Sequence, residues 1–177
     1  VVCSGQDTDF ENVMQGIISL ITSAQKYVYI QSPYLLPTEP ILLALKTAAA
    51  AGVDVRIMIP EKSDSRMVHW GTMSYLQELM EAGIKIYMYQ KGFLHSKLID
   101  CDDCLSSVGS TNMDFRSFEH NFEANAFMYD KTSALMLKEI FLSDQKDAKL
   151  LHLKEWRMRP WSQKVKESVI RLFAPLL

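Results

Sequence analysis

Two side chains in the segment His95-Ser96-Lys97 stand out as candidates for chemistry. Apolar residues around them predict a strand from Leu94 to Cys101, and alternate residues of a strand point to the same face. A neutral imidazole beside a fixed ammonium suits attack on a phosphorus atom whose oxygens need neutralising. The pair of His95 and Lys97 therefore predicts phosphodiester chemistry.

A polar turn follows the next predicted strand, Cys104 to Val108, and reads Gly109-Ser110-Thr111-Asn112. Ser110 offers a hydroxyl and Asn112 an amide donor, and both groups can hold phosphate oxygens. Together with the histidine and the lysine they form a site that needs no metal. The remaining histidines lack such neighbours and are expected to be structural: His69, His120 and His152.

The spacing of these residues matches a known signature. His-x-Lys, four residues, Asp, six residues and then Gly-Ser-x-Asn is the HKD motif of the phospholipase D superfamily, and the chain matches it without a gap. Over nearly all of its 177 residues the chain resembles the bacterial cardiolipin synthases. The segments that carry this likeness are residues 32–37, 51–57, 82–87, 112–118, 121–123 and 174–177.

The resemblance implies a role for each matching residue. His95 would be one of two active-site histidines, of which one forms a phosphohistidine and the other protonates the leaving alkoxide. Lys97 and Asn112 would hold the phosphate oxygens, with Ser110 assisting. Glu123 would accept a hydrogen bond from the imidazole, and that bond would fix the ring tautomer.

Four other motif residues are expected to shape the site without reacting. Asp102 closes the turn after the first motif strand and is not expected to touch the phosphate. The others are Gly109, Arg116 and Asn121, of which the last two brace the loop after the second motif strand.

Metal binding is the alternative at the cysteines. Cys101-x-x-Cys104 with His95 and Asp100 nearby resembles part of a zinc site, but a lone pair of cysteines lacks the second ligand pair. We expect no metal and no other cofactor. The odd number of cysteines, with Cys3 as the third, favours reduced thiols and a cytosol-like compartment.

The chain carries one HKD motif, whereas the superfamily builds its active site from two. Either the first motif precedes Val1 in a longer parent, or two copies pair about a two-fold axis. The opening residues look like the start of a second domain, so residues 1–177 are expected to be one catalytic domain, the C-terminal half of the parent. We expect this half to be inactive unless it is paired.

The resemblance implies that two phosphatidylglycerol molecules yield cardiolipin and glycerol. One alternative is a phosphodiesterase of the same superfamily, a nuclease or lipid hydrolase working as a homodimer. The net charge of −2 argues against nucleic acid as a partner. Another alternative is a non-catalytic partner domain, which the full set of motif residues disfavours.

The elements that must position these residues follow from apolar periodicity. Helices and strands alternate in the first half, which predicts parallel strands joined by helical crossovers. The motif strands follow, joined by tight turns, and then a helical segment over 132–177. The fold class is α/β, a mixed, mostly parallel sheet flanked by helices, with helices at 11–24, 40–51, 66–82, 132–151 and 160–173 and strands at 27–31, 53–59, 84–89, 94–101, 104–108 and 122–129.

No apolar segment approaches the roughly 20 residues of a membrane-spanning helix. We expect the parent to work at the bacterial cell membrane and this fragment to be soluble. From Lys149 to Arg171 there are seven basic residues against two acidic ones, beside a stripe at spacing four: Trp161, Val165, Val169 and Phe173. We expect the stripe to pack onto the domain, with a membrane surface as the alternative partner.

Overall fold

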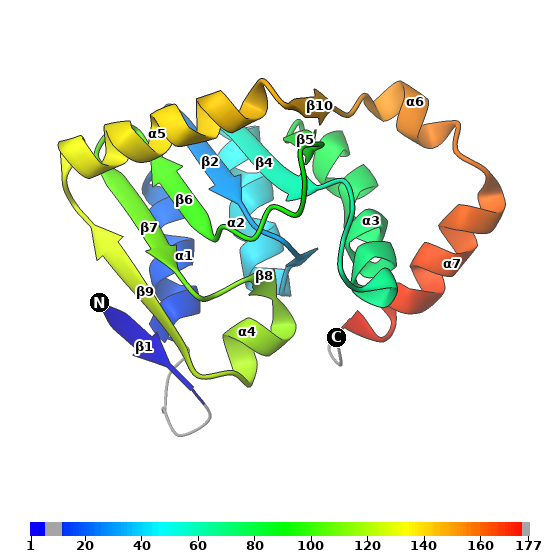
Figure 1. Ribbon diagram of the computed structural model, residues 1–177, viewed down its shortest axis with the longest axis horizontal. Coiled ribbons are helices and arrows are strands. Elements are labelled where there is room, and N and C mark those ends of the chain that lie inside the picture. The colour runs from blue at the N-terminus through cyan, green and yellow to red at the C-terminus, as the bar shows by residue number, and fades with distance from the viewer. Residues whose placement is uncertain (6–11, 175–177) are drawn as a thin grey trace.

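The computed structural model describes residues 1–5 and 12–174, and its centre is a large twisted sheet (Figure 1). Within the described residues this sheet has eight strands in the order β1-β9-β7-β6-β2-β4-β5-β10. A separate pair joins β3 (Leu35–Leu36) to β8 (Met113–Asp114). The strands of the large sheet are β1 (Val2–Ser4), β2 (Tyr27–Gln31), β4 (Asp54–Pro60), β5 (Lys85–Tyr89), β6 (Leu98–Cys101), β7 (Leu105–Gly109), β9 (Glu123–Met128) and β10 (Ala148–Leu150).

The strand directions confirm the predicted α/β class with a mixed sheet flanked by helices. β2, β4 and β5 pair in parallel, and helices α2 (Glu39–Ala50) and α3 (Arg66–Glu81) make the crossovers between them. The other ladders of the described sheet are antiparallel. Five strands of this sheet run in one direction: β1, β2, β4, β5 and β7. Only β2, β4 and β5 are neighbours among them, so the described sheet has just two parallel ladders. A tight turn, as between β6 and β7, leaves room only for antiparallel pairing.

Helices cover both faces of the sheet. α1 (Asn12–Ser23) and α2 lie on one face, and α5 (Lys131–Gln145) crosses the other (Figure 1). Val28 and Ile30 of β2 join the core beneath α1 and α2. Tyr29 points the other way, and its ring stacks on Phe141 of α5 with 4.8 Å between centroids. Burial on both faces explains why every residue of β2 is buried.

Two predicted elements differ in extent from the structure. The strand predicted at 94–101 begins only at Leu98, so His95 and Lys97 precede it and do not share a strand. The ladder with β2 ends at the pair Gln31–Leu98, and beyond it the Ser96 hydroxyl donates to Gln31 Oε1 at 2.6 Å. The helix predicted to reach Leu151 ends at Gln145, because residues 148–150 pair with the free edge of β5. The predicted helix start at Glu11 lies outside the described residues.

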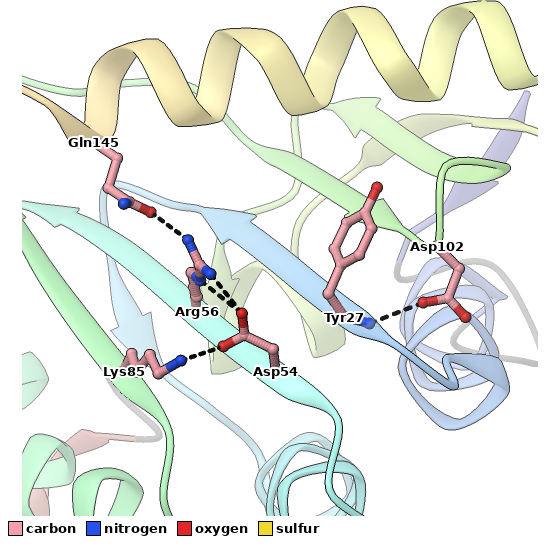
Figure 2. A network of polar contacts seen from close by, with 6 residues as sticks. All are labelled: Tyr27, Asp54, Arg56, Lys85, Asp102 and Gln145. Carbon is pink, nitrogen blue, oxygen red and sulfur yellow. Dashed lines mark hydrogen bonds and ion pairs between the residues drawn. The ribbon is translucent and has the colours of Figure 1, made fainter.

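The turn between β6 and β7 is fixed to the start of β2 by Asp102. Asp102 and Asp103 have φ angles of 53° and 60°, and Cys104 N donates to Cys101 O at 3.1 Å, which are the features of a two-residue hairpin turn. The Asp102 carboxylate accepts hydrogen bonds from the backbone N–H groups of three residues before β2 or at its start, at 2.6, 2.9 and 2.9 Å: Gln25, Lys26 and Tyr27. Figure 2 shows the last of these bonds, from Tyr27.

A second polar network joins the parallel strands to α5. Asp54 accepts hydrogen bonds from Arg56 at 2.6 Å and from Lys85 at 2.8 Å, and Arg56 also donates to Gln145 at 3.0 Å (Figure 2). The two cations lower the pKa of Asp54 despite its partial burial. The network therefore ties β4 and β5 to the end of the helix that covers them.

The C-terminal segment packs on α3. It contains α6 (Leu153–Arg157) and α7 (Trp161–Arg171), which Figure 1 shows outside α3; a further short helix, α4 (Phe115–Glu119), follows β8. The expectation that the apolar stripe of α7 packs onto the domain is wrong, because Trp161 is 77% exposed and Val165 49%. The polar face of α7 packs inward instead. Of the helices among the described residues, none is both long and apolar enough to cross a membrane.

Candidate active site

The motif residues gather where the carboxyl end of β2, the segment before β6 and the end of β7 meet. A pocket of about 450 Å³ there is lined by Gln31, His95, Ser96, Lys97 and Gly109, among others. The His95 ring is exposed and faces the pocket beside Phe93, with 5.5 Å between ring centroids. The structure therefore brings both members of the His-x-Lys pair to one open pocket although they are not on a strand.

Lys97 reaches into a negatively charged part of the site. Its Nζ donates to the backbone O of His95 at 2.9 Å, which holds the ammonium close to the histidine. Partial burial lowers the pKa of Lys97, and the charges of three carboxylates oppose this effect: Glu123, Asp114 and Asp64. A desolvated ammonium attracts a phosphate more strongly than a fully hydrated one does.

Glu123 is buried at the start of β9, and both of its oxygens are occupied. The Ser110 hydroxyl donates a short hydrogen bond to Oε2, and Asn121 Nδ2 donates to Oε1 at 3.2 Å. Ser110 Oγ in turn accepts from Ala124 N at 3.1 Å. The expected bond from the His95 imidazole to Glu123 is absent from the described part of the chain, where Glu123 accepts from Ser110 and Asn121.

Asn112 lies half-buried beyond the β7 turn. Burial raises the pKa of the nearby Asp114 carboxyl, and the Asn112 side chain partly offsets this rise. Asp114 also caps α4 by accepting from Ser117 N at 2.7 Å. Asn112 Oδ1 is buried and has no hydrogen-bond partner in the described part of the chain. An unpaired buried acceptor costs folding free energy, so the position of Asn112 is maintained by the packing around it.

Two motif residues shape the turn by their backbone. A Cβ on Gly109 would lie 2.1 Å from Asn125 Oδ1 and 2.4 Å from Ala124 O, so only glycine fits beside β9. The backbone O of Arg116 accepts from Asn121 N at 2.8 Å, which closes the loop that carries Asn121 to Glu123. The Arg116 side chain is exposed.

A polar contact that sequence reasoning missed holds the segment between the two motif residues. The Ser96 hydroxyl donates to Gln31 Oε1 at 2.6 Å, and Gln31 Nε2 donates to Asp144 of α5 at 2.8 Å. Gln31 is 1% exposed. The available signal was a glutamine at the end of an apolar strand, where a buried amide needs partners.

The two cysteines of the candidate zinc site, Cys101 and Cys104, lie in different environments. Cys101 is fully buried in the main core, whereas Cys104 is exposed. Asp100, the other candidate ligand, is buried and accepts a hydrogen bond from the Tyr27 hydroxyl at 2.7 Å. Within residues 1–5 and 12–174, no group of three or more His, Cys, Asp or Glu side chains is placed to hold a metal.

Comparison with known proteins identifies the family. The family model described as "Cardiolipin synthase, PLD-like domain" matches residues 17–145. Over all 177 residues the chain is 46% identical to cardiolipin synthase 1 of Staphylococcus epidermidis and 45% identical to the cardiolipin synthase of Geobacillus kaustophilus. The chain belongs to the cardiolipin synthase family of phospholipase D-like domains. It spans 36% and 35% of the lengths of these two relatives, about a third of each.

Solved structures show the same fold at low sequence identity. Nuc of Salmonella typhimurium, a phospholipase D family member, has a TM-score of 0.71 at 21% identity and covers 85% of this chain and 98% of its own. The phosphatidylserine synthase of Haemophilus influenzae has a TM-score of 0.79 at 17% identity and covers 99% of this chain and 47% of its own. The phospholipase D fold therefore extends over almost the whole chain.

Proposed function

We propose that this chain supplies one half of a phosphatidyl-transfer site that makes cardiolipin from two phosphatidylglycerols. The observation that carries the proposal is the exposed ring of His95 beside the partly desolvated ammonium of Lys97, on one pocket of a cardiolipin synthase family domain. The pocket is open, as entry of a lipid headgroup requires.

The reaction proceeds in two displacements. One histidine attacks the phosphorus of a phosphatidylglycerol and forms a phosphohistidine, while the bond from phosphorus to the glycerol oxygen breaks. The second histidine donates a proton to that oxygen, and glycerol leaves. A hydroxyl of another phosphatidylglycerol then gives its proton back to the second histidine and attacks the phosphohistidine, which yields cardiolipin.

Four other residues of the motif region support these steps. Lys97 and Asn112 hold the phosphate oxygens, where the ammonium offsets the charge that develops on them. Ser110 assists through the short bond that links it to Glu123. Glu123 acts on the site through Ser110, Asn121 and the electrostatic field at Lys97 rather than through a bond to the imidazole.

A second HKD domain completes the site. His95 is the one histidine among the described residues that line the motif pocket, whereas the reaction needs a nucleophile and an acid. We infer that the other half belongs to the same polypeptide, which the greater length of the matched relatives, about three times that of this chain, supports. In a parent of that length the pocket would face its counterpart at the bacterial cell membrane.

A chimera tests the proposal. This chain replaces the matching segment of the Geobacillus kaustophilus cardiolipin synthase, and products from phosphatidylglycerol are identified by mass spectrometry. The expected products are cardiolipin and glycerol in equal amounts. Phosphatidic acid as the main product would indicate a lipid hydrolase. Cleavage of DNA in a parallel assay would indicate a nuclease. A folded chimera that turns over neither lipid nor DNA would indicate a non-catalytic partner domain. Each of these results would overturn the proposal.

A further inference from the structure

The outward face of α7 and of the residues that follow it is apolar. Its side chains point to solvent along one side of the helix, with exposed fractions between 48% and 79%: Trp161, Val165, Val169, Leu172 and Phe173. We call these five residues the α7 stripe. A helix on a water-soluble surface normally turns such a stripe toward the core, so this one is inverted.

The inward face of α7 is polar and tightly paired. Glu167 is 7% exposed and accepts hydrogen bonds from Arg159 at 2.7 and 3.0 Å. Arg171 donates to Glu78 of α3 at 2.8 Å and lies over the ring of Tyr75. These contacts fix the rotation of the helix, so the exposure of the α7 stripe is a property of the packed fold.

Positive charge surrounds the stripe. Lys164 and Lys166 flank the stripe on α7, and neither has a carboxylate partner within the described residues; Lys164 Nζ donates only to the backbone O of Arg157, at 2.6 Å. The one acid on α7, Glu167, is neutralised by Arg159. Lys154 adds a further positive charge on α6. Glu155 remains as a single acidic neighbour. An apolar stripe with a surplus of lysines is complementary to a bilayer with anionic headgroups.

A run of contacts leads from the groove beside α7 toward the motif pocket. His69 and Trp70 line both the groove between α3 and α7 and a hollow of about 610 Å³ that extends to Glu61. Glu61 N donates to the backbone O of Tyr89 at 2.9 Å, and Tyr89 lines the motif pocket. The groove between α3 and α7 is therefore connected to the motif pocket through adjoining residues.

We propose that the α7 stripe docks on the surface of an anionic lipid bilayer, with Trp161, Val165 and Val169 in the headgroup layer and the lysines on lipid phosphates. The inference rests on the proposed function, since such a bilayer would hold the lipid substrate. Docking itself needs no turnover, so it is measured separately.

Vesicle co-sedimentation tests the docking directly. The 177-residue chain is mixed with vesicles of phosphatidylcholine alone or with 30% phosphatidylglycerol, a composition chosen to be about one-third anionic. The chain is expected to bind the anionic vesicles at low salt. The variant with Trp161→Ser, Val165→Ser and Val169→Ser should bind about tenfold or more weakly. Leu43→Ser on α2 and Met136→Ser on α5 remove equally exposed apolar side chains and should bind like the parent chain.

A charge variant and a fluorescence measurement test the docking independently. Lys164→Gln with Lys166→Gln should reduce binding several-fold at low salt and make it less sensitive to salt. In the Geobacillus chimera, brominated lipids should quench Trp161, measured as the difference between the chimera and its Trp161→Phe variant. The chimera with and without the three stripe substitutions should turn over detergent-solubilised lipid at equal rates. Equal rates would separate docking on a bilayer from the chemical reaction.

Three results would overturn the docking proposal. Equal vesicle binding by the parent chain and the folded stripe variant would exclude the α7 stripe as the contact. Loss of a dimer in the stripe variant, with vesicle binding unchanged, would assign the stripe to a second copy of the chain. No quenching of Trp161 in an active chimera would show that another part of the polypeptide covers it.

Discussion

Ser96 carries no motif letter, yet its contacts determine where its two neighbours lie. Its hydroxyl is bonded to the buried amide of Gln31, which is anchored in turn on Asp144 of α5. His95 itself is exposed and has little packing to hold it. We infer that this tether sets the position of His95 and Lys97 relative to the phosphate.

The tether predicts an effect on turnover. In the chimera, Ser96→Ala is expected to lower cardiolipin formation about tenfold, because displacement of a catalytic group by a fraction of an ångström is costly. Ser96→Thr keeps a hydroxyl and should restore most of the rate, which loss of stability alone would not explain. Equal activity of the alanine and serine proteins would contradict the positioning role.

Asp100 is a buried carboxyl outside the reaction. Burial raises its pKa from 3.8 to about 6, and its Oδ1 has no partner in the part of the chain that is described. In the unfolded chain it ionises near pH ~4. Its contribution to folding stability is therefore fully present below about pH 4 and is lost as the pH rises through about 6.

Asp100→Asn removes this titration. The free energy of unfolding of the Asp100→Asn variant, relative to that of the unmodified chain, should rise by about 3 kcal/mol between about pH 4 and 6 and stay level above pH 6. Urea unfolding of the chain at several pH values measures it. Any change in stability caused by the new amide itself is independent of pH. A difference in the free energy of unfolding that stays constant with pH would therefore contradict the raised pKa of Asp100.

The sequence predicted the residues of the site better than their contacts. The spacing from His95 to Asn112 identified the motif because it is local. The Ser110–Glu123 bond replaced the expected imidazole contact, and Gln31 escaped notice, because partners 13 and 65 residues apart leave no short-range pattern. Hydrogen bonds between distant segments follow from the packing of the whole sheet.

At the level of elements, periodicity predicted most of the sheet. β2 was placed at its observed bounds, 27–31, and the predicted α3, 66–82, ends one residue later than the observed helix. The short elements were missed: β1, β3, β8, α4, α6 and β10. Elements of two to five residues owe their form to tertiary contacts, as in the pairing of β10 with β5, and carry too few residues for a period to show.

Asp102 is predicted to stabilise the β6–β7 hairpin without taking part in chemistry. Asp102→Ala removes the acceptor of three backbone N–H groups and puts alanine at φ 53°, so unfolding of the chain should become easier by about 2 kcal/mol. Asp147→Ala, which loses only an ion pair to exposed Lys91, should cost about 0.5 kcal/mol. Cardiolipin formation per folded molecule of the Asp102→Ala chimera should be unchanged. A large loss of this activity would instead indicate that Asp102 takes part in the reaction.

At the level of the whole molecule, the chain has a phospholipase D-like fold and, in our proposal, supplies half of a site. The matched sheet, helices and motif belong to a domain that is about a third of its cardiolipin synthase relatives. The α7 stripe is a second sign of a missing partner, in our proposal the lipid surface. Amphipathic periodicity predicted this stripe but not its direction, which depends on the ion pairs between α7, α3 and Arg159.

Turnover should therefore require both halves. The monomeric 177-residue chain alone is expected to show no cardiolipin formation, whereas the chimera is active under the same conditions. Gel filtration establishes the oligomeric state of the chain in the assay buffer. Robust turnover by a strict monomer would contradict the two-half site.

The central claim is that His95 reacts with the phosphodiester, and the turnover of the His95→Gln chimera tests it most directly. Loss of the nucleophile or of the acid should lower cardiolipin formation by at least about 10³-fold with unfolding unchanged. His152→Gln, another exposed histidine, should leave the rate as it was. A folded His95→Gln chimera that keeps a tenth or more of the activity would contradict the claim.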